Sequence, residues 1–423
     1  MPIEWTIVND SVPTQSTSGL SRLLGSFRAP GFKLFFTSTT FAAVDMNVRM
    51  AIHGWLVLEL TEDSAFWVGI FAFILGLGQV LFSLVAGAIV DRFQRRSVLL
   101  AEGTLSAAVA WGLAATVYYG VAGLPVVMAT AFLMGCQRAL RFTATNRMVY
   151  DIVGPRHLVN GVALWRVSAT PMMIFGAVLA GVLIDLAGIW AAYAFMGFSL
   201  LLGLIPLSLI RVRGNVERTG ITLFKQTLDG LKLISINRSL RTLFTVSVVM
   251  EGLGFAFLVM IPVVAKTVLH VSGTGFGLLQ AGVGLGMLFS AFFMAANGDA
   301  RHKPTVIFVC ALASGIAMIG FAISRSLPLS MLMAATVMAF LNAYDLTLGA
   351  LMQLVSPPNM RGRAVSLHSL AISFTAFGGF VMGVGAGLIG VPIVLAISGG
   401  GIFANALGRR RALMRIEERS SAE

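Results

Sequence analysis

The stretch Gly87-Ala-Ile-Val-Asp91-Arg92-Phe-Gln94-Arg95-Arg96 joins the end of a long apolar segment to a dense group of charges. One carboxylate and three arginines follow Val90 within six residues. A charged turn directly beside an apolar segment of membrane length is typical of the point where a helix leaves hydrocarbon and meets water. The stretch therefore predicts an integral membrane protein and locates one end of one of its helices.

The composition of the whole chain favours a membrane protein as well. Of the 423 residues, 57% are hydrophobic and only 11% are charged, and the mean hydropathy is +0.88. A soluble protein of this size does not bury so much apolar surface. We therefore expect a lipid bilayer to surround the chain.

Apolar segments long enough to cross about 30 Å of hydrocarbon recur along the sequence. Backbone groups in lipid must be hydrogen-bonded internally, and the segments lack the alternating pattern of barrel strands, so we expect an all-α protein. The twelve predicted spans are residues 32–60, 65–90, 97–119, 124–148, 158–184, 189–210, 242–266, 273–296, 305–324, 328–354, 364–388 and 390–407.

The net charge of +12 is unevenly distributed. Most Lys and Arg residues lie in the two terminal segments or in the loops after every second span, and only Lys266 and Arg325 lie in the other loops. This pattern predicts a multi-pass protein of a bacterial cytoplasmic (inner) membrane with both termini in the cytoplasm. It favours contact with anionic lipid over binding to nucleic acid.

A charged interruption divides the chain into two halves. The segment 211–241 contains seven Lys or Arg residues, and its apolar residues recur at helical spacing, which predicts an amphipathic helix on the cytoplasmic face. The expected parts are a cytoplasmic amino-terminal segment 1–31, a six-helix bundle 32–210, a linker 211–241, a second six-helix bundle 242–407 and a basic cytoplasmic tail 408–423.

Internal repeats support this division. Residues 153–164 are similar to residues 356–367, about 203 positions later, and residues 297–303 are a degraded copy of the stretch quoted first. Repeats of this kind predict two pseudo-symmetric halves with a substrate site between them.

The stretch 87–96 resembles the loop between helices 2 and 3 of the major facilitator superfamily of transporters, whose pattern is G-x-x-x-D-R-x-G-R-R/K. Gln94 departs from the pattern, which has glycine at that position. Residues 55–61 and 361–363 resemble the enterobactin-exporter-like branch of drug and siderophore exporters. The resemblance implies the major facilitator fold, in which helices 1, 4, 7 and 10 line a central cavity.

Most ionisable residues inside the predicted spans lie on those four helices. A charge in hydrocarbon costs several kcal/mol, so each such residue needs a partner, water or a function. Asp45 and Arg49 lie one turn apart on helix 1, where a structural ion pair is the alternative to a role in transport. The candidate substrate and proton cavity consists of Asp45, Arg49, Gln137, Arg138, Arg141, Glu251, Asn342 and Asp345.

The two carboxylates of the second half suggest a coupling mechanism. Glu251 and Asp345 lie at similar depth in their spans. We expect them to bridge to Arg138 or Arg141 when the cavity is closed to the cytoplasm. Protonation of a carboxylate would then loosen the bridge and couple proton entry to substrate exit.

The charged turn is also a candidate gate. In the resembled family the loop aspartate, here Asp91, pairs with neighbouring basic groups and with the amino-terminal end of helix 11. An anion at a helix amino terminus is stabilised by up to about 2 kcal/mol. We expect Arg95 to meet Asp151, and we note that the arginines also serve topology. The candidate gate consists of Gly87, Asp91, Arg92, Arg95, Arg96 and Asp151.

Other reaction classes lack support in the sequence. The glycine string at 385–390 matches a dinucleotide-binding pattern, but no strand precedes it, so we interpret it as a helix-packing surface. Cys136 and Cys310 lie in opposite halves, and no metal-ligand cluster, Walker motif or hydrolase motif is present. We therefore expect neither an enzyme nor a cofactor or metal, and an ion gradient as the driving force.

These features together predict a monomeric secondary transporter that moves a small organic molecule across the bilayer by alternating access. Proton-coupled efflux of a drug-like or siderophore-like compound is the first interpretation. Uptake of an organic anion is the alternative, because two arginines are expected in the cavity. A non-transporting membrane sensor is a further alternative.

Overall fold

The computed structural model describes residues 25–29, 31–211, 237–297, 303–356 and 360–422. The expected amphipathic linker helix and most of the amino-terminal segment 1–31 lie outside these residues. Within them the secondary structure is helical throughout, so the expected all-α class is confirmed.

Five long helices precede the linker. A short 3₁₀ turn, η1 (Gly25–Arg28), leads into α2 (Phe32–Leu60), which coincides with the first predicted span. The others are α3 (Ala65–Arg92), α4 (Arg95–Tyr118), α5 (Leu124–Ala187) and α6 (Ile189–Leu209). We had expected two helices within residues 124–184. Only Gly154 leaves the helical conformation there (φ 67°, ψ 177°), a region open to glycine, so α5 contains both spans joined at a kink.

The second half begins with an irregular helical column. It consists of α8 (Arg238–Val249), the π-helix η2 (Met250–Phe255), α9 (Phe257–Val263) and the π-helix η3 (Val264–Val268). The remaining helices are α10 (Gly273–Asn297), α11 (Lys303–Ile323), α12 (Leu327–Leu354), α13 (Arg361–Ile372), α14 (Phe374–Ile389) and α15 (Val391–Ala422).

The last helix is longer than its predicted span. Residues 390–407 were expected to form it, whereas α15 continues through the basic residues to Ala422. Gly408 disfavours helix, but the Arg, Ala, Leu and Glu residues that follow favour it, and Leu413 and Ile416 of this extension are buried.

Ten helical segments of the described chain have the length and apolar character needed to cross a membrane. The two expected spans outside this group are α2 and the first part of α5, which carry charged side chains such as Asp45, Arg49, Arg138 and Arg141. These charges lower their hydropathy, although α2 is 29 residues long. With these two, the fold provides the expected twelve spans.

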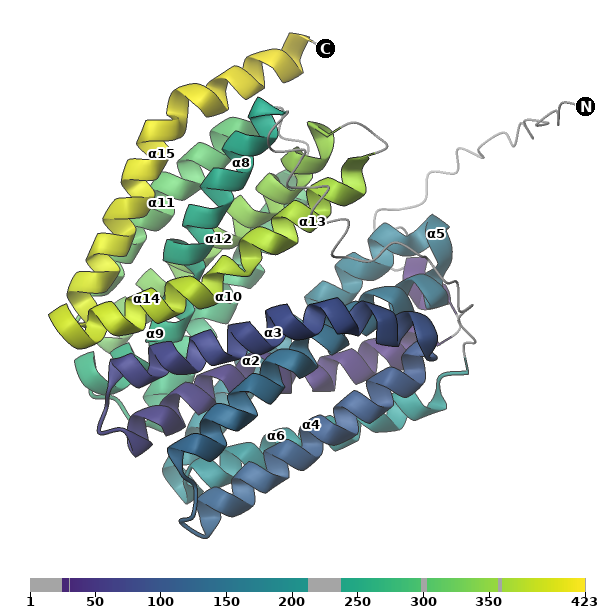
Figure 1. Cartoon of the computed structure of the whole chain (residues 1–423), viewed down its shortest axis with the longest axis vertical. Coiled ribbons are helices and arrows are strands. Elements are labelled where there is room, and N and C mark those ends of the chain that lie inside the picture. Colours follow the sequence, from purple (N-terminus) through teal and green to yellow (C-terminus); the bar gives the residue numbers. More distant parts are fainter. Residues whose placement is uncertain (1–24, 30, 212–236, 298–302, 357–359, 423) are drawn as a thin grey trace, which may run out of the picture.

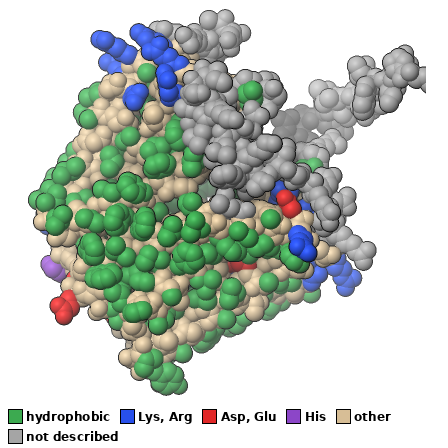
Figure 2. Space-filling view, in the orientation of Figure 1, with side chains coloured by type: hydrophobic (Ala, Val, Ile, Leu, Met, Phe, Trp, Pro, Cys, Tyr) green, Lys and Arg blue, Asp and Glu red, His purple; other side chains and the backbone are tan. Residues whose placement is uncertain are grey.

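The helices alternate between two ends of the molecule. We call the end that contains the turn 93–94, the Gly154 kink and the starts of α2, α8, α11 and α13 the basic end. The opposite end contains the turns at 61–64, 119–123, 188, 269–272, 324–326 and 390. Lys and Arg side chains gather at the top, where α15 ends, and at the right-hand edge, and hydrophobic side chains are spread over the face between them (Figure 2).

Two pairs of long helices make most of the contact between the halves, and α2 and α3 also pack against α9. Helix α3 packs along α14, and the second part of α5 packs along α10. Figure 1 shows α3 and α14 close together towards the opposite end and diverging towards the basic end. The halves are therefore held together near the opposite end.

Glycine permits these close contacts. A β-carbon on Gly383 would lie 2.4 Å from the Cα of Gly69, and one on Gly181 would lie 2.2 Å from the carbonyl oxygen of Gly273. Small residues are the means by which membrane helices approach closely.

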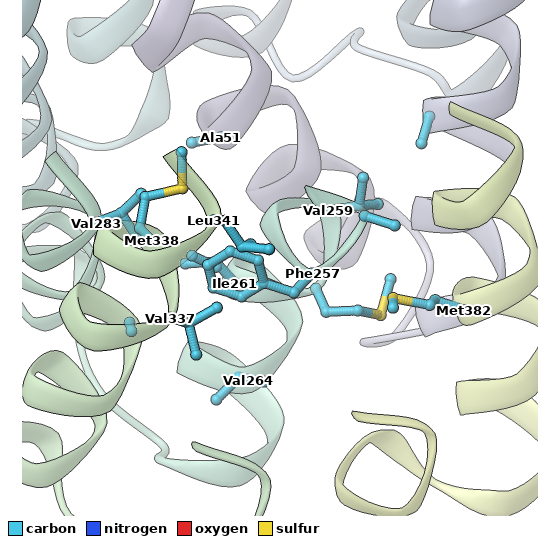
Figure 3. Packing of buried hydrophobic residues seen from close by; sticks show 14 of the residues in the cluster. Ala51, Phe257, Val259, Ile261, Val264, Val283, Val337, Met338, Leu341 and Met382 are labelled. Carbon is cyan, nitrogen blue, oxygen red and sulfur yellow. The ribbon is translucent and has the colours of Figure 1, made fainter. Parts of the chain in front are cut away.

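A hydrophobic core lies around the irregular column (Figure 3). Phe257, Ile261 and Val264 pack beside Val337 and Leu341 of α12, all fully buried. The same cluster includes Val48 and Ile52 of α2, so apolar packing is continuous between the halves.

We call the close glycine contacts between α3 and α14, and those between α5 and α10, the glycine seams. The first of them gives a prediction. Gly383→Ala inserts a methyl group into backbone contact, and we expect it to lower the free energy of unfolding by about 1–3 kcal/mol. Thermal unfolding in detergent measures this loss. Gly400→Ala is the matched control, because its added carbon meets no heavy atom within 4 Å. Equal melting temperatures for both variants would show that close packing at Gly383 does not contribute to stability.

Candidate functional site

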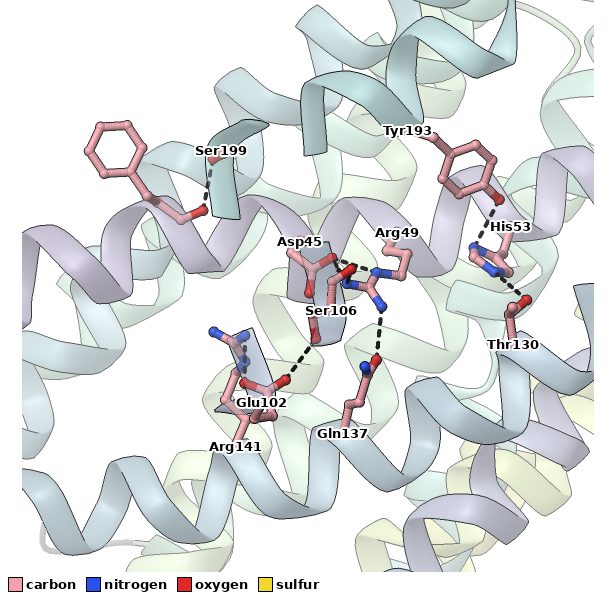
Figure 4. Close-up of polar contacts among 11 residues, drawn as sticks. Asp45, Arg49, His53, Glu102, Ser106, Thr130, Gln137, Arg141, Tyr193 and Ser199 are labelled. Atoms are coloured by element: carbon pink, nitrogen blue, oxygen red, sulfur yellow. Dashed lines mark hydrogen bonds and ion pairs between the residues drawn. The ribbon is translucent and has the colours of Figure 1, made fainter. Parts of the chain in front are cut away.

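The buried charges of the first half form one connected network (Figure 4). Asp45 and Arg49 form an ion pair on α2, and both side chains are almost fully buried. Arg49 also donates a hydrogen bond of 3.0 Å from Nη1 to Oε1 of Gln137 on α5. Its Nη2 lies 3.4 Å from the carbonyl oxygen of Ser106 on α4. Arg49 thus ties three helices together.

A second ion pair continues the network. Arg141 Nη2 on α5 lies 2.6 Å from Glu102 Oε2 on α4. The hydroxyl of Ser106 donates to Glu102 at 2.8 Å. Each buried carboxylate of the network therefore has an arginine as its direct partner.

Arg138 differs from the other two arginines. Its side chain is exposed, and within the described residues it forms neither a hydrogen bond nor an ion pair. Of the two arginines expected to bind substrate, Arg141 is occupied by Glu102 and Arg138 is available.

His53 is held inside the first half. It accepts or donates at both ring nitrogens, 2.9 Å from the hydroxyl of Tyr193 and 3.4 Å from that of Thr130. It also stacks on Phe71 and is fully buried. These contacts give the ring a packing role.

The second half holds a different polar cluster. Glu251 lies in the π-helix η2, is 3% exposed, and accepts a hydrogen bond of 2.6 Å from Thr375 of α14. Asp345 of α12 lies 3.1 Å from Nε2 of His368 on α13. Helices α12 and α14 both pack against η2, and α13 packs against α12, so the three groups share one region.

Tyr344 completes this cluster. Its side chain is 1% exposed, and its hydroxyl has no hydrogen-bond partner in the described chain. Both Glu251 and Asp345 act on that hydroxyl electrostatically. We call Glu251, Tyr344, Asp345, His368 and Thr375 the second-half cluster.

The expected bridges between the halves are absent from this conformation. Asp345 pairs with His368, Glu251 with Thr375 and Arg141 with Glu102. Each group has a nearer partner in its own half, and the halves diverge towards the basic end. The two candidate amides are also engaged locally: Gln137 accepts from Arg49, and Asn342 donates to Ser290 of α10 at 2.7 Å.

The charged turn makes its contacts within the first half. Asp91 at the end of α3 pairs with Arg147 of α5 at 3.0 Å. The expected contact between Arg95 and Asp151 is present at 3.6 Å. Burial raises the pKa of the Asp151 carboxyl above its ordinary value, although Arg95 and Arg147 oppose the rise.

The remaining residues of the stretch 87–96 lie at or near the turn between α3 and α4. Gly87 lies in the last turns of α3, Arg92 is exposed, and Arg96 donates to the carbonyl of Ser208 on α6. Gln94 has φ −61° and ψ 127°, which any residue adopts, and its side chain is exposed. The turn therefore does not require the glycine of the resembled pattern. Asp91 was also expected to face the amino-terminal end of helix 11. Residues 357–359, which precede that helix, lie outside the residues that the structure describes.

Three polar contacts of the described residues join the halves at the opposite end, and we call them the opposite-end latch. The Asp185 carboxylate at the end of α5 accepts hydrogen bonds from the backbone N–H groups of Gly273 and Thr274, at 2.7 and 2.8 Å. These groups begin α10, where an anion is favoured by the helix dipole. Lys266 of η3 pairs with Asp63 at 2.8 Å.

Several partners of the candidate residues were not predicted from the sequence. Glu102 and Arg147 carry the ion pairs of Arg141 and Asp91, and His368, Thr375 and Tyr344 complete the second-half cluster. His368 had a sequence signal, because it is the one ionisable residue well inside the eleventh predicted span.

Comparison with known proteins begins with the family. A family model described as transmembrane secretion effector matches residues 21–423. A chloramphenicol resistance protein of Pseudomonas aeruginosa is 29% identical over 242 residues, which cover 55% of this chain and 53% of that protein. The match thus spans about half the length of this curated relative.

Solved transporters share the fold. A mutant of the nucleoside transporter NupG has a TM-score of 0.73 at 16% identity, covering 91% of this chain and 99% of that chain. A D-xylose–proton symporter has a TM-score of 0.70 at 15% identity, covering 89% and 96%. An inward-facing, occupied bacterial homologue of the human lysosomal transporter Spinster has a TM-score of 0.65 at 14% identity, covering 92% and 96%. Identities this low establish likeness of fold alone.

The buried pair of Glu102 and Arg141 gives a second prediction. Arg141→Met leaves a carboxylate uncompensated and is expected to cost about 3–5 kcal/mol of stability. The double variant Glu102→Gln with Arg141→Met removes both charges and should recover most of that loss, as measured by thermal unfolding. If the double variant is as unstable as the single one, the pair does not neutralise itself as the geometry indicates.

The opposite-end latch gives a third prediction. Asp185→Ala removes two hydrogen bonds to the start of α10 and is expected to lower stability by about 1–2 kcal/mol. Asp185→Asn keeps one acceptor and should lie between the wild type and Asp185→Ala. Identical melting curves for all three proteins would show that the latch contributes nothing.

Proposed function

Because the chain belongs to the transmembrane secretion effector family of the major facilitator superfamily, we propose that it exports a small organic molecule by secondary active transport. Membership makes it a multi-pass membrane transporter. Four parts of this proposal go beyond family membership: export, the compound class, proton coupling and the orientation in an inner membrane.

The contacts between the two halves support transport by alternating access. The halves are joined through two glycine seams and the latch near the opposite end, whereas they diverge towards the basic end. The positive-inside pattern favours a cytoplasmic basic end. We therefore propose that this conformation faces the cytoplasm, from which an exporter takes its cargo.

The compound class rests on the curated relative. That relative is a chloramphenicol resistance protein, which suits removal of a drug-like molecule from the cell. Proton coupling is supported by buried carboxylates in both halves, because such groups in a membrane mark ion or proton pathways.

Uptake of an organic anion is the second candidate, and Arg138 favours it. Arg138 is an exposed arginine on a membrane-spanning helix with no partner among the described residues, which suits an anionic ligand. The two candidates differ in direction and in the charge of the compound.

Inverted membrane vesicles test the proposal. Vesicles with an acidic interior should accumulate chloramphenicol, or another neutral or cationic compound of a screened panel, and a protonophore should abolish accumulation. Vesicles without the protein are the control. Gradient-independent flux would contradict proton coupling, and accumulation of organic anions by right-side-out vesicles alone would favour uptake.

The charged turn gives a fourth prediction. Removing a partly exposed ion pair changes a conformational equilibrium by up to about 1 kcal/mol, or about fivefold. Asp91→Ala and Arg147→Ala should each slow transport several-fold at equal membrane abundance, and the double variant should be no slower than the singles. Arg92→Ala is the control, since Arg92 is exposed. Wild-type transport by Asp91→Ala would contradict a gating role.

A further inference from the structure

The two halves neutralise their buried carboxylates differently. In the first half Asp45 pairs with Arg49 and Glu102 with Arg141. An adjacent guanidinium favours the ionised carboxylate, and a protonated carboxyl would leave the arginine uncompensated in a poorly solvated site. These pairs are therefore poorly suited to taking up and releasing a proton.

The second-half cluster has no such fixed cation. Within the described chain neither Glu251 nor Asp345 forms an ion pair with a lysine or arginine. Their partners are the Thr375 hydroxyl and the His368 imidazole. Histidine changes charge near neutral pH, so every charge in this cluster is one that a proton can alter.

A buried tyrosine hydroxyl lies near these two carboxylates. Tyr344 is 1% exposed, and its hydroxyl has no hydrogen-bond partner among the described residues. A hydroxyl can donate to an ionised carboxylate and accept from a protonated one, so Tyr344 can pair with a neighbouring carboxyl in either protonation state.

The backbone connects this cluster to the seam between the halves. Glu251 lies in a π-helix, a rare form that is frequent at functional sites. A β-carbon on Gly378 of α14 would lie 1.9 Å from the Gly252 carbonyl oxygen, so η2 and α14 touch through their backbones. Helix α14 carries Thr375 and also packs along α3 of the first half. A charge change at Glu251 thus acts next to the helix pair that joins the halves.

We infer that the second-half cluster is the proton-exchange site of the transporter, whereas the first-half ion pairs are structural. This inference rests on the proposed proton-coupled transport. A proton from the outer side adds to the cluster, with Glu251 as the accepting carboxylate, and raises its charge by one. Deprotonation towards the other side restores the carboxylate, and no electrons move. Among the described residues, the titratable groups near Glu251 are Tyr344 and Asp345 of α12 and His368 of α13.

Proton binding can be measured without any substrate. The infrared carbonyl band of protonated carboxyl groups, followed against pH in the detergent-solubilised full chain, reports it directly. The wild type is expected to show a band that titrates between about pH 5 and pH 9, the range open to buried carboxyls. Glu251→Gln should remove that band.

Two further variants keep the test decisive if Glu251→Gln folds poorly. Thr375→Val has nearly the same shape and removes the hydroxyl that donates to the carboxylate. It should raise the midpoint by about half a unit to one unit. His368→Gln should shift the midpoint as well, because the imidazole acts on Glu251.

The matched control lies in the first half. Glu102→Gln with Arg141→Met removes a buried pair together and should leave the band unchanged. Loss of the band in this control, or an unchanged band in Glu251→Gln and Thr375→Val, would overturn the assignment. If the band behaves as expected while vesicles show no proton-driven flux, the site stands and the proposed transport coupling fails.

Discussion

The cost of placing charge in hydrocarbon is the constraint on which the rest of this structure depends. The first half meets it with arginine partners, in the pairs Asp45–Arg49 and Glu102–Arg141. The second half places two carboxylates beside a histidine, a threonine and a tyrosine hydroxyl that has no hydrogen-bond partner in the part of the chain that the structure describes. The first solution fixes charge in place, and the second leaves charge free to change. We therefore propose a rigid first half and a second half that responds to protons.

Backbone packing explains how such a response would reach the whole molecule. The halves approach most closely where glycines face each other, as at Gly69 and Gly383, and the latch adds polar contacts at the same end. Because Glu251 contacts α14, and α14 forms one seam, the proposed proton site lies directly beside the joint. The ion pairs of the charged turn, Asp91–Arg147 and Arg95–Asp151, stay within the first half in this conformation.

Local sequence signals predicted much of the fold, whereas tertiary packing decided the partners. Apolar length located α2 to the residue, and the position of Asp151 just after the fourth predicted span anticipated its contact with Arg95. Periodicity carries no information on which helix faces which. The choice of Glu102 by Arg141, and of His368 by Asp345, therefore emerged only from the structure. The apolar pattern predicts the middle of a helix but not how far its backbone continues. The single kink at Gly154 and the helical tail to Ala422 were therefore not predicted.

The central claim is that a carboxylate of the second half carries the coupled proton. Proteoliposomes containing Glu251→Gln separate coupling from movement of the cargo identified by the vesicle screen. Accumulation driven by a proton gradient and exchange of labelled for unlabelled cargo at equal pH are measured on the same preparation. The account predicts that gradient-driven accumulation is lost while exchange persists. Accumulation at the wild-type level would contradict it.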